Sequence, residues 1–101
     1  AAADARGRTT MADVARKVEI RGRVQGGRFR HATVEAARTI AVAGWVRNRP
    51  DGAVEAFAQG AAADVERFVA WCRHGPPLAR VDDVEVGQVP VEAGLARFDW
   101  K

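Results

Sequence analysis

The fold of this chain is decided by residues 17–43, which read KVEIRGRVQGGRFRHATVEAARTIAVA. Polar and apolar side chains alternate from Lys17 to Val24, and this period of two is typical of a half-buried strand. Gly26 and Gly27 end the pattern, because adjacent glycines allow positive φ and favour a loop. From residue 29 to residue 43 the apolar positions recur three and four apart, which predicts a helix that packs on a sheet.

The rest of the chain predicts a small sandwich of helices and strands. Further strands are expected at about 44–48, 53–59, 81–90 and 96–100, and a second helix at 62–73. The order βαββαβ, with one short strand added at the end, indicates the α+β class. We expect a ferredoxin-like α/β sandwich with two helices on one face of a mostly antiparallel sheet. This architecture hosts enzymes, metal carriers and RNA-binding domains, so it does not decide the activity.

The composition of the 101 residues, 48% hydrophobic and 29% charged, fits one small globular domain. We expect the domain to span 15–101 and residues 1–14 to form a disordered tail, in which Met11 is a candidate start. No apolar stretch approaches the roughly 20 residues of a membrane span. Cys72 has no partner cysteine and lies on the apolar face of the second helix, so we expect a buried thiol and a cytoplasmic protein.

Two histidines and one cysteine are too few for a zinc site built from these residue types, and the carboxylates are not clustered. We therefore expect no metal. We also expect Trp45, Trp71 and Trp100 to pack in the fold, because all three fall within predicted strands or a helix.

Positive charge is concentrated in one part of the chain. The net charge is only +3, yet residues 21–49 contain seven arginines and a single acid, Glu35. A local patch of this kind predicts an anionic partner of limited size. Solvated surface arginines are the alternative, because 14 of the 16 basic residues are arginine and part of that excess can reflect composition alone.

The glycine loop is the first candidate site. A loop that runs from a strand into a helix directs backbone N–H groups into one concavity beside the positive end of the helix dipole, which suits a phosphate. Arg30 lies at the start of the helix, where its guanidinium could grip two phosphate oxygens. A surface arginine beside a tight turn explains the same residues equally well.

Asn48 is the second candidate. It closes the strand before the turn at 49–52, and in a βαββ unit that point comes close to the glycine loop. Its amide could orient a water molecule without acting as a base. An asparagine that merely begins a turn is the alternative.

Three segments carry a resemblance to a known family. Residues 22–30, GRVQGGRFR, resemble the acylphosphatase signature G-x-V-Q-G-V-x-F-R, and residues 44–54, GWVRNRPDGAV, are similar to the second signature, G-W-V-x-N-x-x-D-G-x-V. Residues 75–81, GPPLARV, match a further family segment. The resemblance runs from about residue 16 to residue 100, so the expected domain at 15–101 is acylphosphatase-like.

The resemblance implies the same sandwich fold and a metal-independent acylphosphatase. Such an enzyme hydrolyses acyl phosphates, which are carboxyl–phosphate mixed anhydrides, to a carboxylate and inorganic phosphate, with no cofactor. By motif position Arg30 would bind the phosphate and Asn48 would hold the attacking water. The amides that bind substrate would come from Gln25, Gly26, Gly27, Arg28, Phe29 and Arg30. The implied partners are a small acyl phosphate and inorganic phosphate, as product and inhibitor, for a monomer that binds neither nucleic acid nor membrane.

Three positions depart from the family pattern. Gly27 replaces the usual valine, and Arg28 replaces a residue that is often small. A glycine here should loosen the phosphate cradle, because it loses more conformational freedom on ordering, whereas Arg28 adds a cation. Ala41 replaces a glycine at the end of the first helix, which costs about 1 kcal/mol if the position is left-handed.

Two other readings of the sequence compete with this one. The first is a non-catalytic, basic ferredoxin-like module that binds RNA or another polyanion, although the aromatic strand motif of such RNA-binding domains is not present. The second is the acylphosphatase-like part of larger, carbamoyl-phosphate-using maturation proteins. Their zinc-finger segments need more cysteines than this chain has.

Overall fold

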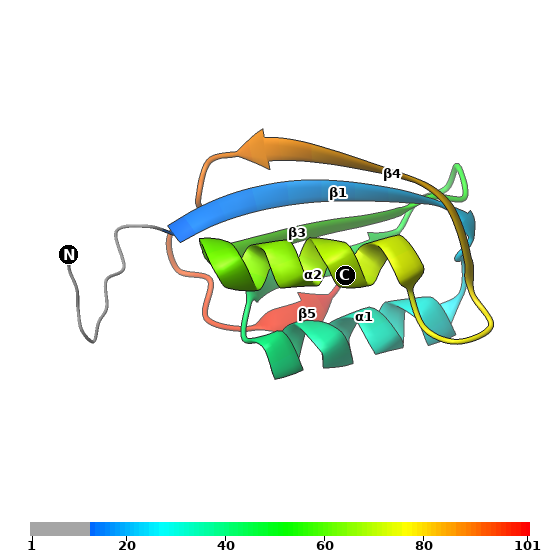
Figure 1. Cartoon of the computed structure of the whole chain (residues 1–101), viewed down its shortest axis with the longest axis horizontal. Coiled ribbons are helices and arrows are strands. Elements are labelled where there is room, and N and C mark those ends of the chain that lie inside the picture. Colours follow the sequence, from blue (N-terminus) through cyan, green and yellow to red (C-terminus); the bar gives the residue numbers. More distant parts are fainter. Residues whose placement is uncertain (1–12) are drawn as a thin grey trace.

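The computed structural model describes residues 13–101 of the chain. Its elements are β1 (Asp13–Arg23), α1 (Gly27–Ile40), β2 (Ala43–Asn48), β3 (Val54–Ala61), α2 (Ala62–His74), β4 (Arg80–Val89) and β5 (Phe98–Trp100). The five strands form one sheet in the order β4-β1-β3-β2-β5, antiparallel except for the β2–β5 pair. Both helices cover the same face of this sheet (Figure 1). The predicted ferredoxin-like α+β sandwich is therefore confirmed.

The start of β1 and the end of α1 differ most from the predicted boundaries. β1 begins at Asp13 rather than at Lys17, so Asp13 and Val14 of the expected tail lie in a strand, and residues 1–12 lie outside the described part. α1 ends at Ile40 rather than at residue 43, because Ala41 adopts a left-handed conformation with φ 79° and its N–H bonds to the Ala37 carbonyl. The apolar pattern continues past that point only because Val42 is buried at the entry to β2.

The core lies between the helices and the sheet. Phe68 of α2 packs on Phe98 of β5, with ring centroids 5.5 Å apart, and both side chains are fully buried. Cys72 is also fully buried, as expected, and burial raises the pKa of its thiol to about 12. The thiol therefore stays protonated and unreactive in the folded protein.

Close strand packing explains two of the motif glycines. A side chain at Gly22 would place its Cβ 2.2 Å from the Arg80 carbonyl oxygen of β4, and one at Gly44 would place it 1.8 Å from the Phe57 carbonyl oxygen of β3. Both glycines also have positive φ. They bring strands together, and so their part in any site is indirect.

None of the helices in residues 13–101 is long and apolar enough to cross a membrane.

Candidate active site

One end of the sheet collects the predicted site residues. β1 and β2 both run antiparallel to β3, and β5 runs parallel to β2, so β1, β2 and β5 have their C-terminal residues at the same end of the sheet. That end is at the right in Figure 1, where α1 begins and the β2–β3 turn lies. The glycine loop, Asn48 and Trp100 are therefore brought to one end of the molecule by the strand directions alone.

The glycine loop opens directly into α1. Gly26 precedes the first helical residue with φ 100° and ψ 172°, no side chain caps the helix, and its first turn contains no acidic residue. The N–H groups of the N-cap and the first three helical residues, 26–29, have no carbonyl partner inside the helix. They face outward at the positive end of the helix dipole, where an anion is the favoured partner.

Arg30 and Asn48 share an unusual property. Among residues 13–101, the buried side-chain polar atoms that have no hydrogen-bond partner are Arg30 Nε and Asn48 Oδ1. Leaving a buried polar atom unpaired costs about 1–3 kcal/mol, so proteins rarely do it without a reason. One atom is a donor and the other an acceptor, and both lie without a partner at the same end of the sheet.

Trp100 lies beside Arg30, on the strand next to the one that ends at Asn48. The Arg30 guanidinium lies 5.4 Å from the centroid of the Trp100 ring, which is the distance of a cation–π contact. Trp100 in turn pairs with Val46, two residues before Asn48 on β2. The expectation that all three tryptophans are packed away is wrong here, because Trp100 is 51% exposed, whereas Trp45 and Trp71 are partly buried. Sequence reasoning missed this contact, since no local pattern relates residue 30 to residue 100.

The arginine-rich segment is mostly neutralised by acids from elsewhere in the chain. Four of its seven arginines have acidic partners: Arg21 and Arg49 with Glu19 and Asp51, Arg38 with Asp99, and Arg47 with Glu55. The other three, Arg23, Arg28 and Arg30, have no acidic partner among the residues that the structure describes. They flank the glycine loop or belong to it, so the unbalanced positive charge gathers there.

Gln25 ties the loop to the neighbouring turn. Its side-chain Nε2 donates to the Ala53 carbonyl at 3.1 Å, and the Arg49 backbone N–H donates to the same oxygen at 2.8 Å. The Ala53 N–H donates to Asp51, and this hydrogen bond, with the charge of Arg49, holds the pKa of that carboxyl below its usual range. The sequence predicted only a backbone role for Gln25. The structure adds a side-chain link between the loop and the turn that follows Asn48.

The other loop residues differ in what they offer. Gly27 has an ordinary helical backbone, and a Cβ there would meet nothing within 4 Å, so neither the backbone nor crowding at Cβ requires a glycine. Arg28 is exposed. Phe29 is buried and packs on Trp71 at 5.9 Å between ring centroids, so only its backbone can serve the loop. Within residues 13–101 no three potential metal ligands come together.

The geometry thus defines a small α+β sandwich with a glycine loop that suits an anion at one end of its sheet. Residues 16–100 match the family described as Acylphosphatase. The chain is 49% identical over 83 residues to an acylphosphatase of Rubrobacter xylanophilus, covering 82% of this chain and 76% of that protein. It is 51% identical over 81 residues to one of Burkholderia vietnamiensis, covering 80% and 83% respectively.

Solved structures agree. An acylphosphatase from Coxiella burnetii superposes with a TM-score of 0.83 at 30% identity, covering 89% of this chain and 94% of that one. A full-length HypF gives the same TM-score at 28% identity, but the match covers only 12% of its chain. The chain belongs to the acylphosphatase family, and hydrolysis of acyl phosphates is its activity.

Proposed function

We propose that Arg30 and the amides of residues 25–30 bind the phosphoryl group, and that Asn48 orients the attacking water. The observation that carries this proposal is the pair of unpartnered buried atoms, Arg30 Nε and Asn48 Oδ1. The Arg30 Nε–H donates to a phosphoryl oxygen. Asn48 Oδ1 accepts a hydrogen bond from water, which leaves a lone pair of that water available to face phosphorus.

The reaction needs little more than this. The water oxygen forms a bond to phosphorus, the bond between phosphorus and the acyl oxygen breaks, and the carboxylate leaves with the electron pair. The water proton passes to a phosphoryl oxygen, because Asn48 cannot accept it at neutral pH. A carboxylate is a good leaving group, so positioning and charge stabilisation supply most of the rate. No step in this scheme calls for a metal or an organic cofactor.

The charge around the loop supports a small anionic substrate. Arg23, Arg28 and Arg30 lie near one helix start without acidic partners among residues 13–101, which favours phosphate over a neutral ligand. The same cradle binds inorganic phosphate after the reaction, so phosphate is both product and inhibitor. We further propose that the enzyme acts as a cytoplasmic monomer, in keeping with its single buried cysteine.

The test follows hydrolysis of benzoyl phosphate with a chelator present. Arg30→Ala and Asn48→Ala should each lower kcat/KM by about 100-fold or more, as loss of one preorganised donor or positioning group does. Arg67→Ala and Gln88→Ala, which remove exposed polar side chains on α2 and β4, are the matched controls and should leave kcat/KM unchanged.

Stability separates this role from a structural one. Because Asn48 Oδ1 has no partner, Asn48→Ala should not lower the free energy of unfolding, whereas a residue that merely holds the turn would lower it. Full activity in either site variant would refute the assignment. Tight binding of an RNA oligonucleotide, with no hydrolysis by the natural protein, would favour the non-catalytic alternative.

A further inference from the structure

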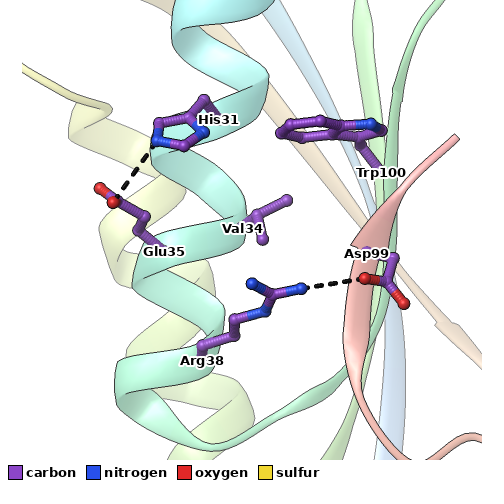
Figure 2. A pocket seen from close by; sticks show the side chains of 6 residues that line it. All are labelled: His31, Val34, Glu35, Arg38, Asp99 and Trp100. Carbon is purple, nitrogen blue, oxygen red and sulfur yellow. Dashed lines mark hydrogen bonds and ion pairs between the residues drawn. The ribbon is translucent and has the colours of Figure 1, made fainter.

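A cavity of about 430 Å³ lies between α1 and β5, next to the proposed phosphate site. Six residues line it: His31, Val34, Glu35, Arg38, Asp99 and Trp100. Figure 2 shows Trp100 and the Arg38–Asp99 ion pair at its two ends, with Val34 pointing between them from α1. None of these residues takes part in the chemistry proposed above.

The cavity continues from Arg30. Arg30, Val34 and Arg38 are four residues apart, so they form one stripe along α1. With a rise of about 1.5 Å per residue, Val34 lies roughly 6 Å along the helix axis from Arg30. Trp100 belongs to both places, because its ring contacts the Arg30 guanidinium and also lines the cavity. A group attached to a phosphate held at Arg30 therefore starts beside Trp100 and has room to extend along the stripe.

The polar side chains of the lining pair with one another. Arg38 pairs with Asp99 at 2.9 Å, and His31 lies 3.4 Å from Glu35 on the next turn of the helix. Arg38, the arginine of the lining, thus already has an acidic partner and is not free to bind a second anion. The apolar surface that remains open to a ligand is the half-exposed ring of Trp100, because Val34 is almost fully buried.

We propose that this cavity holds the acyl group of the substrate, and that Trp100 makes the enzyme prefer a planar, uncharged acyl group. The inference rests on the proposed phosphate site at Arg30. An aromatic acyl group stacks on the exposed indole and removes its apolar surface from water. A short acyl group such as acetyl reaches too little of the ring to benefit, and an acyl group that carries a second phosphate meets an arginine, Arg38, that is already paired with Asp99.

The experiment compares two substrates through a ratio. We would measure kcat/KM for benzoyl phosphate and for acetyl phosphate, because their ratio cancels effects on the shared phosphoryl end, including any shift of Arg30. Trp100→Leu should lower this ratio by about tenfold. Trp45→Leu is the matched control: Trp45 lies on the adjacent strand but stacks on Phe57, 6.1 Å between centroids, on the other face of the sheet, so the ratio should not change.

A second measurement avoids both mutation and turnover. In the natural enzyme, the inhibition constant of phenylphosphonate should be about tenfold lower than that of methylphosphonate, because only phenylphosphonate reaches the Trp100 ring. Equal inhibition constants, or an unchanged substrate ratio in Trp100→Leu, would overturn the acyl site. In that case both substrates would still be hydrolysed and would still depend on Arg30, so the proposed function would stand. Loss of the Arg30 dependence would instead overturn the proposed function.

Discussion

The adjacent glycines of the cradle offer a matched pair of substitutions. A Cβ at Gly26 or at Gly27 would meet no atom within 4 Å, so neither substitution is opposed by crowding. The two residues differ in backbone: Gly26 has φ 100° and ψ 172°, a region almost reserved for glycine, whereas Gly27 begins α1 with a helical backbone. Substitution by alanine should therefore change the free energy of unfolding in opposite directions at these neighbouring positions.

The magnitudes follow from conformational energy. Gly27→Ala reduces the freedom of the unfolded chain and should raise the free energy of unfolding by about 0.4–1 kcal/mol. Gly26→Ala forces a side chain into a strained region and should lower it by about 1–3 kcal/mol. A difference of about 2 kcal/mol between the variants corresponds to roughly 10 °C in Tm for a domain of this size.

Thermal unfolding followed by circular dichroism measures the change in stability. The inhibition constant for inorganic phosphate measures the effect of each substitution on phosphate binding. Gly27→Ala orders the cradle in advance and should tighten phosphate inhibition by about twofold. Gly27→Val, which restores the residue of the family signature, should do the same. Gly26→Ala should weaken it. A Tm for Gly26→Ala equal to or above that of Gly27→Ala, or phosphate inhibition that none of these changes alters, would refute the reasoning.

Three further predictions concern the end of α1, the buried carboxylate Glu55 and the side chain of Gln25. Ala41→Gly should raise the free energy of unfolding by about 1 kcal/mol in urea titrations, because Ala41 has φ 79°, and a decrease would contradict this. Burial raises the pKa of Glu55, but hydrogen bonds from Lys17 and Arg47 outweigh it and hold the pKa below its ordinary 4.5. The resulting stability is present above pH 4.5 and lost as the pH falls through the lowered pKa. Glu55→Gln should therefore flatten this acid limb, and an unchanged limb would exclude Glu55 as its source. Gln25→Ala should weaken phosphate inhibition by roughly 2- to 10-fold, and Gln25→Glu, which cannot donate, should match it; full affinity in either would show that the link is dispensable.

Local signals were enough to predict the order of elements and the place of the glycine loop. The alternation from Lys17 to Val24 and the glycines that follow depend only on neighbouring residues, and the structure confirms the fold that they indicate. The end of α1 could not be read in this way. Val42 continues the apolar period although the chain has already turned at Ala41, because a residue buried at the entry to a strand looks the same as one on a helix face.

The sequence by itself determined that this chain forms a βαββαβ sandwich, that a glycine loop leads into its first helix, and that it carries acylphosphatase motifs. Only the tertiary structure decided which arginines keep their charge unbalanced, because the acids that neutralise Arg38 and Arg47 come from β5 and β3. It also decided that Trp100 contacts Arg30 and lines a cavity. Contacts between residues so distant in the chain depend on strand order and direction. These are properties of the packed sheet, and no pattern among neighbouring residues indicates them.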